Sequence, residues 1–221
     1  SPVVAFSVLR MLIAFAVTHG YDITQVDFDA AFLNALLPQD TEIYMKQPKG
    51  FERYGPDGEE MTCKLRRALY GLKQSGRLWY QTLRAHMEEQ GYHCLDMDQC
   101  VFIKHNGSNW VIVIAYVDDV LCFSNNQEMK DEFITQLAES FSITNKGKLQ
   151  YYLGINVQAY GHTCTMDQKK YIQELLDEFV VDTVQVTTPI AANPSSDDTK
   201  LSDGEATQLK RMVGCLVYVS T

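Results

Sequence analysis

Apolar side chains recur along the first twenty residues at the spacing of one helix face. The pattern predicts a core helix over residues 2–18, opened by Ser1-Pro2 and closed by Gly20. The stretch includes Arg10 and is too short to span a bilayer. Its apolar positions are Phe6, Leu9, Leu12, Ile13, Ala16 and Val17.

The rest of the chain alternates between short β-rich runs and helical patterns, which predicts an α+β fold. Gly55-Pro-Asp-Gly58 marks a turn inside a segment, 38–68, that we expect to be irregular. Asn106-Gly107 predicts a type I′ hairpin turn. A stretch rich in Pro, Ser, Thr and Asp, 182–205, has the composition of a linker. The predicted helices are 29–36, 75–91, 127–140, 168–180 and a last one from 208 to 218; the predicted strands are 23–27, 100–105, the hairpin 110–124, and segments near 148–158 and 161–167.

Two adjacent carboxylates interrupt the apolar run of the predicted hairpin 110–124. Asp118 and Asp119 follow Tyr116-Val117 and precede Val120, so we expect them at the hairpin tip. Ionising two neighbouring acids is costly unless a cation lies between them, and carboxylates together with substrate phosphates suit a divalent metal. The alternative is a solvated Asp-Asp turn, because Asp is a common turn residue.

A third acid stands at the end of a predicted strand. Gln25-Val26-Asp27-Phe28 runs directly into a predicted helix, which places Asp27 where it can meet the hairpin tip. Asp29 is adequately explained as an acid at a helix start.

Charge and cysteine content limit the class of protein. The net charge is −9, with 28 acids and 19 Lys and Arg residues. Residues 61–87 nevertheless contain no acid and several cations, interleaved with Tyr70, Trp79 and Tyr80, a composition that suits phosphate contacts. For Trp79 and Tyr80 we favour inward packing. Six scattered cysteines without a Cys-x-x-Cys pair predict reduced thiols in an intracellular protein.

Four segments, in this order, resemble the reverse transcriptase of copia-type LTR retrotransposons. The resemblance covers essentially the whole chain, from Ser1-Pro2-Val3 to Gly214-Cys215-Leu216. The segments are Gln25-Val-Asp27 with Ala31-Phe32-Leu33-Asn34, Leu69-Tyr70-Gly71-Leu72-Lys73-Gln74-Ser75, Tyr116-Val117-Asp118-Asp119 and Tyr152-Leu153-Gly154.

The resemblance implies an RNA-directed DNA polymerase that transfers nucleotides to a primer 3′-hydroxyl with two Mg²⁺ ions, or Mn²⁺ as the alternative. The implied catalytic residues are Asp27, Asp118 and Asp119, with the Phe28 carbonyl as a further metal ligand. The implied nucleotide-binding residues are Phe32, which would exclude ribonucleotides, and Tyr70, Gly71, Lys73 and Gln74; the implied primer grip is Tyr152, Leu153 and Gly154.

The resemblance also implies an arrangement of domains and partners. A palm would comprise 1–37 and 75–158, partial fingers 38–74 and the start of a thumb 159–181; a linker 182–205 would precede 206–221, which would lead toward RNase H. Because family members have a basic segment before the Ser-Pro-Val motif, we expect this chain to be a fragment of a polyprotein. Expected partners are an RNA or DNA template with its primer, deoxynucleotides, and the RNase H and integrase regions of that polyprotein, in a cytoplasmic particle or the nucleus and not in a membrane.

Two positions depart from the family pattern. Gly76 stands where Pro is more frequent, and Ile143-Thr144 stand where a Lys is often the proton donor to pyrophosphate. Lys146 and Lys148 are displaced from that place, so no general acid is assigned. Two alternatives remain: a catalytically silent remnant that binds nucleic acid or another protein, and another palm enzyme, an RNA-templated RNA polymerase or a nucleotide cyclase.

Overall fold

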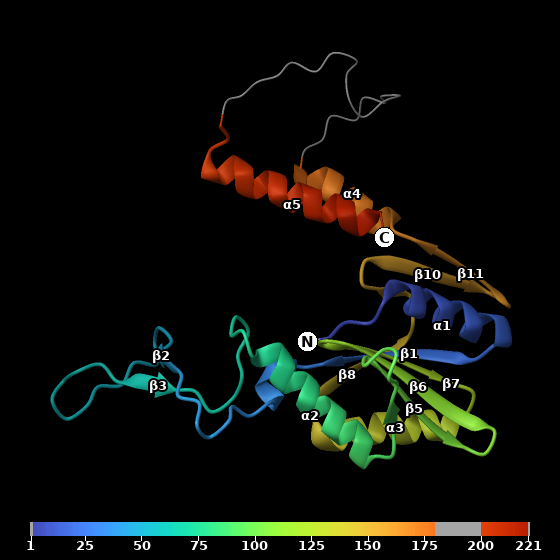
Figure 1. The fold of residues 1–221 in the computed structure, drawn as a ribbon, viewed down its shortest axis with the longest axis horizontal. Helices are drawn as coiled ribbons and strands as arrows, with labels where there is room; N and C mark the ends of the chain where they lie inside the picture. Colours follow the sequence, from blue (N-terminus) through green and yellow to red (C-terminus); the bar gives the residue numbers. More distant parts are fainter. Residues whose placement is uncertain (1, 180–199, 221) are drawn as a thin grey trace. The chain divides into compact units, whose positions relative to one another are not determined.

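A six-stranded antiparallel sheet forms the centre of the larger of two units in this computed structural model (Figure 1). The structure describes residues 2–179 and 200–220. The first unit comprises 1–149 with 160–163, and the second comprises 150–159 with 164–221; each is described by itself. The strand order is β4 (His93–Cys94), β5 (Val101–Asn106), β6 (Asn109–Tyr116), β7 (Asp119–Ser124), β1 (Asp22–Phe28) and β8 (Ile143–Lys148).

Three helices cover the sheet. Figure 1 shows α1 (Phe6–His19) on one face and α2 (Ser75–Glu89) and α3 (Gln127–Ser140) on the other. Alternate residues of the central strands pack against α2 and α3, as the two-residue period of a strand requires. The α+β fold class predicted from the sequence is therefore confirmed. Members of the core on the α2–α3 side include Val26, Phe28, Val111, Val113, Val120, Trp79, Leu83, Met87, Phe133 and Leu137.

The segment 38–68 contains a short hairpin that was not predicted. Strands β2 (Tyr44–Lys46) and β3 (Thr62–Lys64) pair antiparallel, and their residues are largely exposed. The predicted turn is confirmed, because the amide of Gly58 donates to the carbonyl of Gly55 at 3.0 Å. Strands of three residues are too short to show a two-residue alternation, so their sequence could not indicate them.

The second unit combines a three-stranded sheet with two helices. Strands β9 (Tyr151–Tyr152), β10 (Ile155–Tyr160) and β11 (Thr163–Asp167) form the sheet, followed by α4 (Lys169–Phe179) and α5 (Asp203–Val219). Helix α5 begins with a capping box in which Ser202 and Glu205 bond each other's backbone amides. The predicted linker lies mostly outside the described residues, and 203–205 belong to this helix.

Three predicted elements were wrong in their details. Helix α1 begins at Phe6 and not at residue 2, because Ala5 is extended and its amide donates to the Asp98 carboxylate at 3.2 Å. Residues 29–36 form only a 3₁₀ turn, η1 (Ala31–Asn34), preceded by Ala30 in the left-handed region. In the β5–β6 hairpin Asn106 pairs with Asn109, so Gly107 occupies the first loop position and the expected Asn-Gly turn is shifted by one residue.

Two boundaries were predicted well, and strands β4 and β8 were missed in addition to β2 and β3. Gly20 ends α1 with a φ of 70°, a backbone conformation that Gly adopts without steric cost. Helix α3 spans the predicted residues 127–140. Strand β8 begins at Ile143, ahead of the predicted segment near 148. In the described ranges, every helix is too short or too polar to cross a bilayer.

Candidate active site

The β6–β7 hairpin turns through two residues and carries both acids at its tip. Tyr116 pairs with Asp119, which leaves Val117 and Asp118 as the loop. Val117 has a φ of +54°, a conformation that β-branched residues avoid and that costs on the order of 1–3 kcal/mol. The amide of Phe28 donates to the carbonyl of Asp118 at 2.8 Å. The end of β1 is thus fastened directly to the tip.

The buried indole of Trp79 stabilises the hairpin tip through a hydrogen bond. Trp79 on α2 is 1% exposed, and its Nε1 donates to the carbonyl of Val117 at 2.7 Å. The indole ring packs edge-on against Phe28 and Phe141. The expectation that Trp79 packs inward is confirmed, and its polar atom also holds the loop that presents Asp118.

Substitution of Trp79 by Phe should lower the free energy of unfolding by about 1–3 kcal/mol, because the Val117 carbonyl loses its buried donor. Urea unfolding followed by circular dichroism measures the change. Trp110→Phe is the matched control, since no side-chain hydrogen bond of Trp110 is recorded within the described residues. Equal losses in the two variants would show that the hydrogen bond contributes nothing.

Sheet register brings Asp27 beside Asp119. The two residues are partners across the β1–β7 pair, and β8 pairs on the other side of β1. Nζ of Lys146, on β8, lies 3.0 Å from Oδ1 of Asp27 and 3.2 Å from Oδ1 of Asp119. Asp119 also accepts a hydrogen bond from Nε2 of the buried Gln25 at 3.2 Å. One ammonium group therefore bridges two of the three acids.

Asp118 points to a different partner. The Tyr70 hydroxyl donates to its Oδ2 at 2.7 Å, whereas its Oδ1 is buried with no hydrogen-bond partner in the described residues. Burial raises the pKa of Asp118; the Tyr70 hydrogen bond opposes the shift, and the charges of Asp27 and Asp119 add to it. Burial and the bond to Asp118 raise the pKa of Tyr70 to about 12, so its hydroxyl stays protonated.

The residue types suit a hard divalent cation. Three carboxylates lie at one end of the sheet. The buried Oδ1 of Asp118 has no hydrogen-bond donor among the described residues, and a cation could bind this oxygen instead. As the side chains stand, however, no three His, Cys, Asp or Glu residues of 2–179 and 200–220 are grouped as metal ligands. Lys146 supplies the positive charge between Asp27 and Asp119. Burial alone would lower the pKa of Lys146, but its bonds and charge interactions with Asp27 and Asp119 raise it overall.

Phe32 contacts Tyr70, whose hydroxyl is hydrogen-bonded to Asp118. The two rings are 4.4 Å apart between centroids, and Phe32 is half-buried against the core. The neighbouring Leu33 and Leu36 are exposed, so Phe32 does not belong to an apolar helix face shared with them. Gly71, Lys73 and Gln74 lie in the tight turns before α2, where the Ser75 hydroxyl donates to the Leu69 carbonyl at 2.5 Å; Lys73 is exposed.

Tyr152, Leu153 and Gly154 belong to the second unit. They form the tight turn between β9 and β10, with φ values of 47° at Leu153 and 76° at Gly154. The Tyr218 hydroxyl donates to the carbonyl of Leu153, and a Cβ at position 154 would lie 3.3 Å from the Tyr218 ring. Gly154 is therefore required by its φ and by this close approach.

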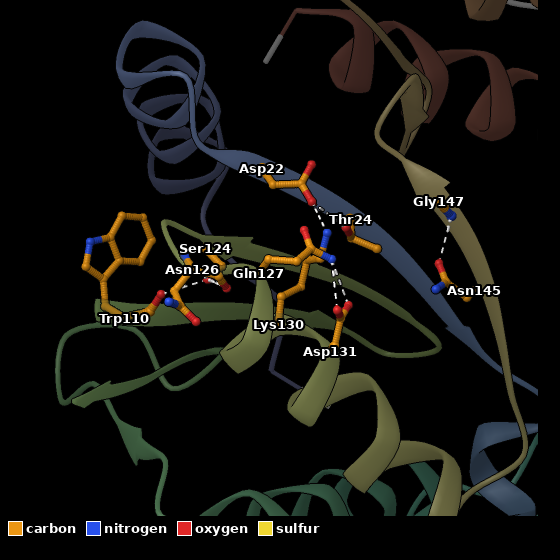
Figure 2. Close-up of polar contacts among 10 residues, drawn as sticks. All are labelled: Asp22, Thr24, Trp110, Ser124, Asn126, Gln127, Lys130, Asp131, Asn145 and Gly147. Carbon is orange, nitrogen blue, oxygen red and sulfur yellow. Dashed lines mark hydrogen bonds and ion pairs between the residues drawn. The ribbon is translucent and has the colours of Figure 1, made fainter. Parts of the chain in front are cut away.

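The explanation of Asp29 as a helix-start acid was wrong. Its carboxylate accepts hydrogen bonds from the hydroxyls of Ser142 at 2.6 Å and Thr144 at 3.2 Å, and its amide donates to the Ser142 carbonyl. Asp29 thus fastens the start of β8 to the end of β1. At the other end of β1, Asp22 accepts from the largely buried Lys130 of α3, as Figure 2 shows. Both ends of the strand that carries Asp27 are pinned.

Sequence reasoning did not assign Lys146 or Gln25 to the site. Lys146 precedes a glycine inside a strand, and a glycine in a strand often marks a bulge that redirects a neighbouring side chain. That signal was present but depended on recognising β8. Gln25 has no sequence signal of its own, since its contact with Asp119 depends on strand register alone.

Comparisons with known proteins agree on one family. The family model described as "Reverse transcriptase (RNA-dependent DNA polymerase)" matches residues 1–192. The chain is 34% identical over its whole length to the retrovirus-related Pol polyprotein from transposon RE1 of Arabidopsis thaliana, of which it covers 15%. It is 34% identical over 87% of its length to that from transposon TNT 1-94 of Nicotiana tabacum, of which it covers 14%.

Two more distant similarities were also found. The putative transposon Ty5-1 protein of Saccharomyces cerevisiae is 27% identical over 87% of the chain, which covers 62% of that protein. A solved structure of telomerase from Candida albicans aligns with a TM-score of 0.41 at 10% identity, over 81% of this chain and 38% of that one. The chain thus spans about one seventh of the plant polyproteins it matches.

Proposed function

Because the chain belongs to the reverse transcriptase (RNA-dependent DNA polymerase) family, as its resemblance to copia-type retrotransposon enzymes predicts, we propose that it is the polymerase core of a longer polyprotein. The activity would be the addition of deoxynucleotides to a primer 3′-hydroxyl along an RNA or DNA template. One observation supports this above the others: Asp27 and Asp119, from distant segments, pair in adjacent strands beside Asp118.

The family uses divalent metal ions, and we assign their ligands in this chain as Asp27, Asp118, Asp119 and the Phe28 carbonyl. When bound, two such ions stabilise the charge on attacking and leaving oxygens and favour the ionised primer hydroxyl. The acids are hard oxygen donors, as Mg²⁺ or Mn²⁺ requires. Burial and, to a smaller extent, the charges of Asp27 and Asp119 raise the pKa of Asp118, and a bound cation would oppose that shift.

The groups around Tyr70 would receive the incoming nucleotide. The Tyr70 hydroxyl is held by Asp118, which fixes the ring against Phe32 beside the acids. This placement supports Phe32 as the residue that excludes a 2′-hydroxyl. Lys73 is exposed and available for phosphates, with Gly71 and Gln74 beside it in the same turn segment. We assign Tyr152, Leu153 and Gly154, in the second unit, to the primer grip.

We assign the palm to 1–37 and 75–158, partial fingers to 38–74, the start of the thumb to 159–181 and the lead toward RNase H to 206–221. The six-stranded sheet with its acids suits a palm, and the exposed β2–β3 hairpin suits fingers. RNase H and integrase regions of the same polyprotein would be its covalent neighbours, since the relatives are Pol polyproteins.

Primer extension tests the proposal. A longer polyprotein chain that includes these residues should extend oligo(dT) on poly(A) with Mg²⁺, and chelation with EDTA should stop extension. A catalytically silent remnant would bind the template–primer duplex but would not extend it under any metal condition. Absence of extension by a folded longer chain would contradict the polymerase assignment.

Duplex binding by the 221-residue chain should be weak and sensitive to salt. Of the cations in 61–87, Lys64 and Arg84 form ion pairs and Arg67 donates to the Leu33 carbonyl. Arg66, Lys73 and Arg77 have no recorded side-chain partner among the described residues. With about three phosphate contacts, affinity should fall about 10- to 100-fold between roughly 50 and 200 mM salt. Fluorescence anisotropy of a labelled duplex measures it, and binding that does not change with salt would contradict this footprint.

A further inference from the structure

Lys146 reaches the acids because β8 contains a bulge. On β1, Gln25 pairs with Gly147 and the next residue, Val26, pairs with Asn145, so Lys146 is the extra residue without a partner of its own. A bulge bends its strand and redirects a side chain, and such bulges are frequent next to active sites. Here the redirected side chain places its ammonium group between Asp27 and Asp119.

Local contacts on both sides hold the bulge in place. The Asn145 side chain accepts a hydrogen bond from the amide of Gly147 at 2.9 Å (Figure 2), and Gly147 has a φ of 76°, which a glycine adopts without steric cost. At the start of the strand, Asp29 binds the hydroxyls of Ser142 and Thr144. These contacts fix the backbone at Lys146, and the bulge directs its side chain toward the two acids.

Lys146 is the cationic partner recorded for Asp27 and for Asp119 within the described residues. Its Nζ contacts Oδ1 of each acid, so the ammonium group occupies the position between the two carboxylates. Without a positive charge there, the neighbouring carboxylates repel one another. A divalent cation on the same oxygens would in turn repel the ammonium group.

We propose that Lys146 is a resident counter-ion of the Asp27–Asp119 pair, which a divalent cation displaces when it binds. The proposal rests on the function proposed above and adds a positioning residue to that site. Lys146 keeps the two acids together in the absence of metal, and it lowers their affinity for metal because both cations need the same oxygens.

Direct metal binding by the 221-residue chain tests the proposal. Mn²⁺ titration followed by electron paramagnetic resonance of the free ion should show about tenfold tighter binding for Lys146→Met than for the unmodified chain. Lys146→Arg keeps the charge and should bind Mn²⁺ about as weakly as the unmodified chain. Lys148→Met, a second exposed lysine of β8 without an ion pair recorded in the described part of the chain, is the matched control and should change nothing.

Thermal unfolding provides a second readout that does not depend on activity. In EDTA, Lys146→Met should unfold at a lower temperature than Lys148→Met, and Mn²⁺ should raise its unfolding temperature by more. Equal or weaker Mn²⁺ affinity of Lys146→Met, or none at all, overturns the proposal. Failure of the polymerase assignment would appear separately, as lack of primer extension by the longer chain with Lys146 intact.

Discussion

Replacement of Asp118 by Asn should abolish primer extension by the longer chain, with a loss of about a thousandfold or more. The variant retains shape and the Tyr70 contact but removes a charge from the proposed metal ligands, and such charge stabilisation contributes several kcal/mol to the transition state. Single-turnover extension of oligo(dT) on poly(A) measures the rate. Duplex affinity, measured by anisotropy, should change little, because Asp118 is not one of the side chains proposed to contact phosphate.

Stability distinguishes this loss from unfolding. Because the pKa of Asp118 in the folded protein is raised above its usual value, the folded state holds this proton more tightly than the unfolded state. Ionisation of Asp118 therefore costs folding free energy as pH rises above about 4. In EDTA at neutral pH, Asp118→Asn should be at least as stable as the unmodified chain. Asp131→Asn, an exposed acid of α3, is the control, and normal extension by Asp118→Asn would remove Asp118 from the site.

Substitution of Phe32 by Val should admit ribonucleotides while most deoxynucleotide incorporation remains. A bulky ring beside the sugar excludes the 2′-hydroxyl by steric conflict, and a smaller side chain removes that conflict. Discrimination, taken as the ratio of kcat/KM for dTTP and UTP, should fall on the order of a hundredfold. The ring of Phe32 lies against Tyr70, which is bonded to Asp118, so the substitution alters the surface next to the acids.

Leu33→Val is the matched control for this experiment. Leu33 adjoins Phe32 in the same 3₁₀ turn but is 39% exposed, and its truncation should leave discrimination unchanged. If a folded and active Phe32→Val variant still rejects UTP, Phe32 is only a packing residue at the edge of the core.

Long periodic segments were predictable, whereas short elements determined by tertiary contacts were not. The helix 127–140 and the hairpin that carries Asp118 and Asp119 follow directly from apolar periodicity. The helix predicted over 29–36 is a 3₁₀ turn, because Ala30 adopts a left-handed conformation and Leu33 remains exposed. The start of α1 depends on Asp98, which is distant in sequence, so no local pattern could reveal it.

Some residues of the candidate site were predictable from sequence motifs, and others depend on tertiary contacts. The three acids, Phe32 and Tyr70 were identified from motifs, and the structure places them together at one end of the sheet. Lys146 was seen but given no role, because its contact with Asp27 requires a bulge in a strand that was itself missed. The support of the tip by Trp79 also depends on packing between α2 and the hairpin, which the sequence does not encode locally.

The place of β1 in the sheet has a consequence for synthesis of the chain. This strand lies between β7 and β8, so residues 22–28 leave the ribosome long before 119–124 and 143–148 exist to pair with them. An unpaired strand with a buried pattern can pair with the same strand of another nascent copy. Antiparallel pairing of two copies would set Asp22 near Asp27, and parallel pairing would set like acids side by side. Because like charges set side by side across a strand pair repel, we expect these carboxylates to disfavour such pairing before any site forms.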